Sequence, residues 1–254
     1  MKVVRGFSVA GVIAIVVVVL LLGVGTFLVV DGNNKATNYN DYDFYSVIEG
    51  TKDNGNIGDH VKGDVNAPVK IFEYADYQCS GCASVNPRVN KVVEELDGKL
   101  AVVYRSFVLD YHQNGKAAAA AAEAAGLQGY WKEYADKLFA EQSEWFSASV
   151  SERTALFDKY FEEVTDGKGD VEKFNADLGS DAVKDKVSFD MGIGKRIGVS
   201  GTPAFYIDGQ LIKWTDAGEV TVDGRTVSWD SGQSGDDFVK LIEEIVNTKL
   251  GEDK

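Results

Sequence analysis

Hydrophobic residues form an uninterrupted run near the start of the chain. No charged residue occurs between positions 6 and 30, and most of these residues are Val, Ile, Leu or Ala. A helix over this run would be about 37 Å long at ~1.5 Å per residue, enough to cross a ~30 Å hydrocarbon core. A cleaved signal peptide has a shorter apolar stretch and an Ala-x-Ala-like cleavage site, which residues 31–34 (Asp-Gly-Asn-Asn) do not provide. We therefore expect residues 1–30 to form an N-terminal transmembrane helix, with a signal peptide as the alternative.

The charges beside this run predict its orientation. Lys2 and Arg5 lie on its short N-terminal side, and positively charged flanks stay in the cytoplasm. The N-terminus is then cytoplasmic, and residues 31–254 form the extracytoplasmic part of a single-pass protein of the cell membrane. That compartment allows disulfides to persist.

Residues 31–62 show no clear apolar period and are rich in Asn, Asp, Gly and Tyr. This composition is typical of a tether, and we expect an extracytoplasmic linker that becomes ordered near residues 57–61. Its aromatic side chains could dock on the folded domain or on the lipid interface, but we favour a loose linker. These aromatic residues are Tyr39, Tyr42, Phe44 and Tyr45.

Beyond residue 62 the hydrophobic pattern alternates between the periods of strands and helices. Runs of β-branched and aromatic residues predict strands at 69–74, 100–107, 204–207, 211–214, 219–222 and 225–229. Helical spacing predicts helices over 80–96, 116–125, 130–139, 151–163, 170–178, 181–197 and about 235–249. Asp-Gly pairs predict hairpin turns at 208–209 and 223–224.

The order of these elements predicts an α/β fold. A βαβ unit is followed by a helical block and then by a ββα unit, which one mixed sheet with helices on both faces satisfies. We expect one folded domain over residues 63–250, with the helical block at about 114–198 as a lateral insertion.

The charge balance argues against nucleic acid as a partner. The formal net charge is −14, and without the +2 of Lys2 and Arg5 the rest of the chain carries −16. A phosphate backbone is bound by basic surfaces, which this chain lacks. We interpret the acidic surface as a source of solubility rather than as a binding face.

The two cysteines of the chain, Cys79 and Cys82, are three residues apart. A disulfide that closes so short a loop restricts the unfolded chain little, so it contributes little to stability. A structural zinc site needs about four ligands, and only His60 and His112 are available to complete one. The pair is therefore predicted to be chemically active rather than architectural.

The sequence Cys79-Ser80-Gly81-Cys82 follows a predicted strand and begins a predicted helix. Unpaired backbone N–H groups and the positive end of the helix dipole stabilise an anion there, so the pKa of Cys79 should fall below its free value of ~8.5. We assign Cys79 as the exposed nucleophile and Cys82, one turn along, as the resolving thiol.

Glu73 lies six residues before Cys79 in the preceding strand. Strand alternation places it on the same face as Val69 and Ile71. If that face is the core, burial raises the pKa of the carboxyl, which could then exchange a proton with Cys82. The alternative is a carboxylate at the end of the strand that points to solvent.

Thr202 and Pro203 precede the predicted strand at 204–207. A cis bond between them would interrupt normal ladder pairing and leave the Thr202 backbone free to receive an extended substrate. An ordinary trans proline at the start of a strand is the alternative.

Three strings of the sequence resemble one protein family. They are residues 72–82 (Phe-Glu-Tyr-Ala-Asp-Tyr-Gln-Cys-Ser-Gly-Cys), the alanine-rich stretch after His112, and residues 201–206 (Gly-Thr-Pro-Ala-Phe-Tyr). Over about residues 57–250 the chain resembles the DsbA-like branch of the thioredoxin superfamily, especially its membrane-anchored DsbA/BdbD-type members from Gram-positive and related bacteria. Pro87 resembles the proline that kinks the active-site helix in this superfamily.

The resemblance implies a thioredoxin-like fold with a helical insertion, a cis Thr202–Pro203 bond beside the disulfide and a buried acid at Glu73. It also implies reoxidation by a quinone-linked membrane partner of the DsbB or VKOR kind.

Three positions depart from the family pattern. Many oxidases of the family have Pro after the first cysteine or His before the second, where this chain has Ser80 and Gly81. Val108 stands where the family often has Pro. Because the middle dipeptide tunes thiolate stability, Ser80 and Gly81 bear on oxidase strength.

These observations predict an extracytoplasmic thiol:disulfide oxidoreductase, namely an oxidase that donates the Cys79–Cys82 disulfide to exported cysteine-containing proteins. A reductase or isomerase that uses the same cysteines is the first alternative, and a non-catalytic thioredoxin-fold binding module is the second. No EF-hand-like spacing, P-loop or G-x-G-x-x-G pattern occurs, so we expect neither a required metal nor a nucleotide cofactor.

Overall fold

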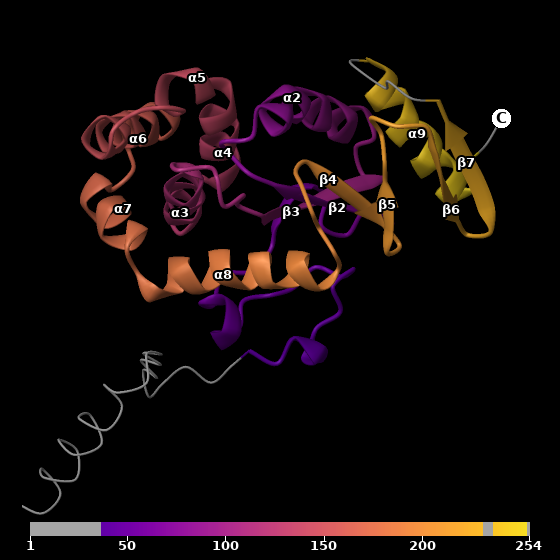
Figure 1. The fold of residues 1–254 in the computed structure, drawn as a ribbon, viewed down its shortest axis with the longest axis horizontal. Helices are drawn as coiled ribbons and strands as arrows, with labels where there is room; N and C mark the ends of the chain where they lie inside the picture. The colour runs from indigo at the N-terminus through magenta and orange to yellow at the C-terminus, as the bar shows by residue number, and fades with distance from the viewer. Residues whose placement is uncertain (1–36, 231–235, 253–254) are drawn as a thin grey trace, which may run out of the picture. The chain divides into compact units, whose positions relative to one another are not determined.

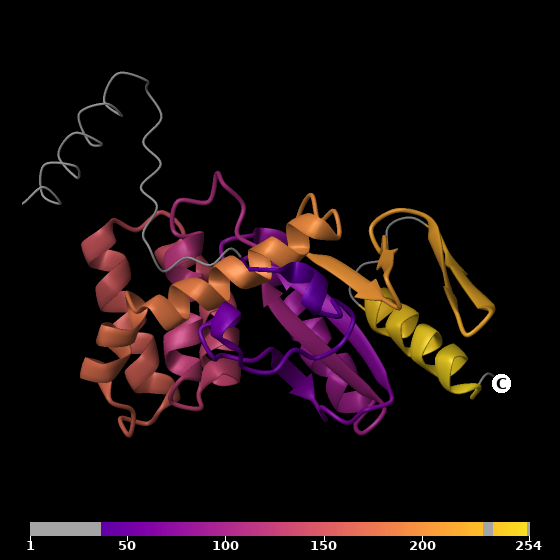
Figure 2. The same ribbon diagram turned by 90° about the horizontal axis from the view of Figure 1, so that it is seen from below.

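A five-stranded mixed sheet forms the centre of the fold in the computed structural model, which describes residues 37–230 and 236–252 (Figures 1 and 2). The strand order is β1-β3-β2-β4-β5; β2 and β3 run parallel, and the other neighbouring pairs run antiparallel. The bounds are β1 (His60–Gly63), β2 (Val69–Ala75), β3 (Leu100–Ser106), β4 (Ala204–Ile207) and β5 (Gln210–Ile212). The strands predicted from hydrophobic runs are therefore confirmed to within two residues at most ends.

Strand β2 separates two hydrophobic cores because its side chains alternate between the faces of the sheet. Val69 and Ile71 pack with the valines of α2 (Ser80–Glu95) and with α9 (Asp236–Leu250). Phe72 and Tyr74 pack on the opposite face, against α8 (Asp181–Arg196). Figure 1 shows α2 on one side of the sheet and α8 on the other. The predicted sandwich of helix, sheet and helix is present.

The helical lobe beside the sheet has its own aromatic and alanine-rich core. Ala118, Tyr134, Trp145 and Phe161 are fully buried in it. Alanine lets the neighbouring helices approach α3 closely and has the highest helix propensity. The lobe consists of α3 (Gly115–Gly126), α4 (Trp131–Ala140), α5 (Gln142–Trp145), α6 (Val150–Val164) and α7 (Val171–Leu178), together with α8. Only α5 was absent from the sequence prediction, because four residues are too few to show a helical period.

The hairpin of β6 (Gly218–Val222) and β7 (Arg225–Trp229) forms a separate two-stranded sheet. These two strands lie outside the predicted βαβ and ββα mixed sheet, which the central sheet confirms. Their alternating apolar residues Val220, Val222 and Val227 face the core that contains α9. The hairpin therefore packs on that helix, and the Gln210 side chain of β5 bonds to the Thr221 backbone in place of ladder pairing.

Residues 38–59 are packed on the domain, which corrects the expected loose linker over 31–62. Tyr39 stacks on Phe189 of α8 at 5.4 Å between ring centroids, and Tyr42 meets the same ring edge-on at 4.9 Å. Gly192 provides the room for Tyr39, because a Cβ there would collide with the tyrosine ring. Phe189 and Gly192 lie about 150 residues from Tyr39 along the chain, so local periodicity could not predict this packing.

Four buried charges join this N-terminal arm to the sheet and to α8. Asp59 accepts hydrogen bonds from Arg105 at 2.7 Å and from Lys186 at 3.2 Å, and Lys186 also binds Asp190 at 2.7 Å. Two positive and two negative charges balance, and each side chain is almost completely buried. Burial opposes ionisation of Asp59, but Lys186 and Arg105 outweigh it and hold its pKa below the usual range.

The predicted transmembrane helix at 1–30 lies outside the described residues. Within residues 37–230 and 236–252, no helix combines the length and apolar character needed to cross a bilayer.

We expect Asp59→Asn to lower the free energy of unfolding by about 3–5 kcal/mol, because it leaves the buried Arg105 and Lys186 with an uncompensated positive charge. Asp166→Asn is the control: Asp166 pairs with Lys168 on the surface, where such pairs contribute about 0–1 kcal/mol. Urea unfolding of the two variants and the wild type measures both values. Equal effects of the two substitutions would show that the buried charges do not hold the arm.

Candidate active site

The turn between β2 and α2 is held by the side chain of Asp76. One carboxylate oxygen accepts the backbone N–H of Gln78 at 2.9 Å. The other accepts the N–H of Leu109 at 2.8 Å and lies 2.7 Å from Nδ1 of His112. The backbone N–H of Cys79 donates to the Asp76 carbonyl at 2.9 Å. The turn that carries the first cysteine is therefore fixed to the loop after β3.

Cys79 is the N-cap of α2, with extended backbone (φ −77°, ψ 121°), and its side chain is half-buried. Its pKa falls to about 5, chiefly because the Cys82 thiol donates a hydrogen bond to the sulfur. Burial opposes this fall but is the weaker effect, and the Thr202 side chain and the N–H groups of Cys82 and Gly81 lower the pKa further. As a thiol, Cys79 instead donates to the Thr202 carbonyl oxygen at 3.3 Å. The predicted exposed nucleophile therefore sits among donors that favour its anion.

Cys82 lies one turn further along α2 and has no exposed surface. Burial raises the pKa of its thiol well above the usual 9.0, and the interaction with Cys79 raises it further. The two sulfurs therefore have opposite tendencies, since Cys79 is stable as an anion and Cys82 as a neutral thiol.

The dipeptide between the cysteines faces the loop before β4. Ser80 is exposed, and Gly81 lies against Pro203. A Cβ on Gly81 would lie 3.2 Å from Pro203 Cδ and 3.6 Å from Cys79 Sγ, so the missing side chain permits this close approach. The Thr202–Pro203 bond is cis, as the sequence predicted.

A groove of ≈ 380 Å³ continues from this loop along the edge of the sheet. Thr202, Pro203 and Tyr206 line one part of it, and Leu211 and Trp214 line another. This groove reaches the cysteine-facing loop.

Glu73 is buried in β2, on the face that carries Val69 and Ile71, as the strand alternation predicted. Neither carboxylate oxygen has a hydrogen-bond partner among the described residues. Burial raises its pKa from 4.5 to about 7, against the attraction of Lys62 and with a contribution from Asp136. Its charge also contributes to the raised pKa of Cys82, so the carboxyl and the resolving thiol interact electrostatically.

The family model described as Thioredoxin matches residues 55–224, about two thirds of the chain. The chain belongs to the thioredoxin family. The match includes the cysteine pair, Glu73 and the Thr202–Pro203 loop.

Solved structures share the fold of this thioredoxin-family chain. Oxidised BdbD from Bacillus subtilis superposes with a TM-score of 0.57 at 18% identity, over 81% of this chain and 99% of the other. Alpha-DsbA1 from Wolbachia pipientis superposes with a TM-score of 0.56 at 21% identity, over 76% of this chain and 94% of the other. The family match, this fold and the paired sulfurs support the predicted enzyme class, a protein-disulfide oxidoreductase.

Curated relatives share only part of their length with this chain. The Na(+)/H(+) antiporter NhaA 1 of Salinispora arenicola is 33% identical over 157 residues, which are 60% of this chain and 22% of that protein. The antiporter NhaA of Herminiimonas arsenicoxydans is 32% identical over 67% of this chain and 24% of its own length. The chain thus spans about a quarter or less of these relatives.

Several polar residues of this thioredoxin-family site were not identified from the sequence. Lys62 of β1 is buried and donates to Asn86 at 2.6 Å, to Asn90 at 2.8 Å and to Asp136 at 3.1 Å. This cluster lies beside Glu73, whose pKa it modulates. The members come from β1, α2 and α4, so no local pattern links them.

His112 holds Asp76 below the cysteine turn, a role that the sequence did not reveal. Both residues lie inside or beside strings that carried the family resemblance, which is the one signal that could have marked them. The aromatic residues Trp131, Tyr134, Phe139 and Trp145 are buried core residues, whereas Phe146 is exposed.

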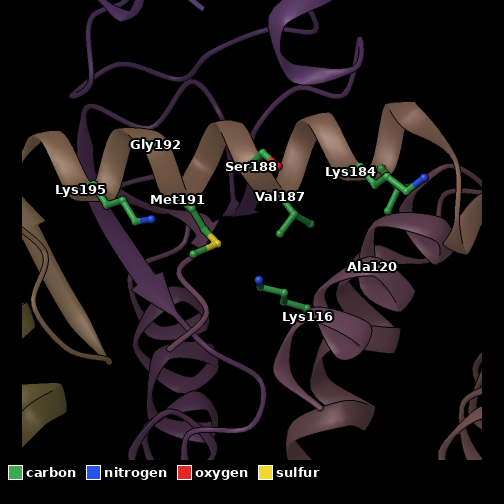
Figure 3. A pocket seen from close by; sticks show the side chains of 9 residues that line it. Lys116, Ala120, Lys184, Val187, Ser188, Met191, Gly192 and Lys195 are labelled. Carbon is green, nitrogen blue, oxygen red and sulfur yellow. The ribbon is translucent and has the colours of Figure 1, made fainter. Parts of the chain in front are cut away.

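A second hollow, of ≈ 380 Å³, lies between α3 and α8. Lys116 of α3 and Lys195 of α8 extend toward it from opposite sides, beside Met191 (Figure 3). Neither cysteine lines it, so it is separate from the redox pair.

We predict that the ultraviolet absorbance of the Cys79 thiolate titrates with a midpoint near 5 in the reduced protein. Cys82→Ala should raise this midpoint because it removes the strongest donor to the sulfur, whereas Cys82→Ser keeps a hydroxyl donor and should raise it less. A midpoint near the free value of ~8.5 in the wild type would contradict the assignment.

Glu73→Gln should stabilise the protein at alkaline pH. The folded pKa of about 7 exceeds the usual 4.5, so the folded state holds the proton more tightly, and the wild type loses stability as pH rises between these values. At ~1.4 kcal/mol per unit of pKa difference, the loss in the free energy of unfolding reaches about 3 kcal/mol above pH ~7. Urea unfolding across this pH range should show the variant more stable at pH ~8 and the difference vanishing toward pH ~4. A pH-independent difference would contradict a protonated buried acid.

Proposed function

We propose that the chain is an extracytoplasmic disulfide oxidase that passes the Cys79–Cys82 disulfide to exported proteins. The observation that carries this proposal is the opposite behaviour of the two sulfurs at the start of α2, with the pKa of Cys79 lowered to about 5 and that of Cys82 raised. Stabilising one thiolate stabilises the dithiol form, and an enzyme with a stable dithiol readily gives its disulfide away.

The reaction begins when a client thiolate attacks Cys79 Sγ in the disulfide. The Cys79–Cys82 bond breaks, a bond forms between Cys79 and the client, and Cys82 leaves as a thiolate. Because buried Cys82 is stable only as a thiol, it takes a proton from Glu73, whose pKa of about 7 keeps a protonated fraction near neutral pH.

A second client thiolate then attacks the client sulfur of the mixed disulfide. The client disulfide forms and Cys79 leaves as the thiolate that Cys82, Thr202 and the first amides of α2 stabilise. Two electrons pass from the client dithiol to the cysteine pair. The two thiolates that attack and the two that leave balance in charge, and the only internal proton transfer is that from Glu73 to Cys82.

The groove beside Thr202 and Pro203 is the proposed position for the client. Its lining combines backbone of the cis-proline loop with the side chains of Tyr206, Leu211 and Trp214. An extended segment there would bring its cysteine toward Cys79, because the Thr202 carbonyl is already within 3.3 Å of that sulfur. Exposed backbone beside side-chain pockets is how proteins bind extended peptides, so the groove favours an unfolded segment over a folded surface.

Location and recycling complete the proposal. The uncharged run at 6–30, with Lys2 and Arg5 before it, supports a membrane anchor with the catalytic domain outside. A quinone-linked membrane reoxidase of the DsbB or VKOR type would then restore the disulfide. This part rests on the sequence pattern and on the family resemblance.

We predict a reduction potential clearly more oxidising than the ~−270 mV of thioredoxin, because the dithiol form contains a stabilised thiolate. Equilibration with glutathione buffers measures it. The oxidised protein should form the disulfide of a reduced two-cysteine peptide, Cys79→Ala should lose this activity, and Cys82→Ala should arrest with the client bound to Cys79.

The same measurements separate the alternatives. A potential near ~−270 mV together with fast insulin reduction would favour a reductase or isomerase. A wild type that exchanges no disulfide in either direction would leave a binding module.

A further inference from the structure

A row of titratable side chains crosses the sheet from its edge to Glu73. His60 of β1 is the register partner of Tyr104 in β3, and Tyr104 is the register partner of Glu73 in β2. Partners on neighbouring strands project from the same face of a sheet at ~4.8 Å per strand, so the row spans about 10 Å. Since β1 is an edge strand, the row leads from the buried acid to the border of the sheet.

The inner part of this row consists of buried polar atoms without partners. In the described part of the chain, no hydrogen bond of good geometry reaches the carboxylate oxygens of Glu73 or the hydroxyls of Tyr104 and neighbouring Tyr77. The two hydroxyls nevertheless affect each other's pKa. The two tyrosine rings lie 5.4 Å apart. Burial raises the pKa of Tyr104 well above 10, and the charges of Tyr77, Glu73 and Cys82 contribute. Tyr104 therefore lies between the resolving thiol, its acid and the sheet edge.

Buried polar atoms of this kind are rarely left unsatisfied in proteins, and ordered water is the usual partner. A hydroxyl both donates and accepts a hydrogen bond. A continuous line of such groups, completed by water, is what a proton needs to cross a protein interior.

The outer part of the row is held in place by two elements of the helical lobe. His60 Nε2 lies 2.7 Å from Glu123 Oε2 of α3, and the imidazole stacks on Trp131 of α4 at 4.4 Å with 3° between the planes. The His60 side chain is 14% exposed, whereas that of Glu123 is 1% exposed. The ring of Trp131 in turn packs on the ring of Tyr104, with 5.3 Å between the ring centroids. His60 is therefore the member of the row that reaches water.

Other charged groups near the row are occupied by partners. At the inner end, Lys62 is held by Asp136 and two asparagines. At the outer end, the charge of Glu123 acts on Lys186 and Asp190, which pair with each other. These fixed pairs set the local potential but offer no free proton acceptor, whereas imidazole is the side chain suited to proton exchange near neutral pH.

We propose that His60, positioned by Glu123 and Trp131, is the proton port of the active site and exchanges protons with Glu73 through Tyr104. The inference rests on the proposed function, since Glu73 must regain the proton that it gives to the leaving Cys82 thiolate. Per disulfide transferred, one proton passes from Glu73 to Cys82. One proton then moves inward along the row to Glu73, and His60 recovers it from water. His60 and Tyr104 touch neither sulfur and act through Glu73.

The test uses the full chain in a single turnover with a reduced two-cysteine peptide. His60→Phe keeps a ring on Trp131 but cannot carry a proton, and Tyr104→Phe removes one hydroxyl. Tyr130→Phe, a tyrosine of the same lobe outside the row, is the matched control. We expect His60→Phe and Tyr104→Phe to slow the transfer about tenfold, a part of the ~10²–10⁴-fold typical of acid–base catalysis, and Tyr130→Phe to leave it unchanged.

Three readouts distinguish a proton port from a structural role. Imidazole in the buffer should restore the rate of His60→Ala, whose emptied site can admit it, but not that of Tyr104→Phe. The solvent deuterium isotope effect should rise in His60→Phe. When Glu73→Gln is already present, His60→Phe should slow the transfer no further, because the Glu73 carboxyl to which His60 returns protons is gone.

Wild-type rates in both His60→Phe and Tyr104→Phe would overturn the inference while leaving the oxidase intact. A slow His60→Ala that imidazole does not restore, together with a lowered urea midpoint, would also overturn it and assign a structural role. If the wild type itself transfers no disulfide, the proposed function fails first.

Discussion

The chemistry of this protein depends on how one sulfur anion is stabilised at the start of α2. Cys79 occupies the N-cap, where the first backbone N–H groups of a helix have no intrahelical partner, and the buried Cys82 thiol adds a donor of its own. The same interaction has opposite effects on its two members, since the pKa of Cys79 falls and that of Cys82 rises. A disulfide between such unequal sulfurs breaks in one direction, with Cys79 receiving the client and Cys82 needing a proton.

Other parts of the domain maintain this difference between the two sulfurs. Burial of Cys82 requires a nearby proton donor, and Glu73 provides one because the sheet removes its carboxyl from water. The cis-proline loop closes the other side, where Gly81 allows Pro203 to approach the sulfur. Asp76 ties the cysteine turn to the loop after β3 through two contacts, with Leu109 and His112, and braces the turn itself through a third, with Gln78. A rigid turn of this kind keeps the sulfur in register with its donors.

Two polar networks connect the sheet with the surrounding helices, and they do different things. The balanced cluster of Asp59, Arg105, Lys186 and Asp190 joins the N-terminal arm to α8 and satisfies its own charges. The row from His60 to Glu73 contains buried atoms that lack partners among the described residues. A satisfied network adds specificity to the packing, whereas an unsatisfied one next to a reacting group is suited to proton movement.

The sequence by itself determined the elements and the redox pair. Period-two alternation in β2 was enough to place Glu73 on the core face with Val69 and Ile71, because side chains of a strand must alternate. The position of Cys79 between a strand and a helix was enough to predict a stabilised thiolate, because helix ends carry free N–H groups whatever the fold. The cis bond at Pro203 was expected from the family resemblance.

Only the tertiary structure decided the partners of these groups. Local periodicity could not show that Tyr39 packs on Phe189, that the hairpin at 218–229 leaves the central sheet, or that Lys62 lies beside Glu73. Nor could it align His60 with Tyr104 and Glu73, since that alignment depends on the pairing of three strands from separate parts of the chain. The physical reason is the range of each effect. Backbone geometry and the periodic spacing of buried residues act over a few residues. The register of strands and the pairing of buried charges are set by contacts between residues far apart in sequence.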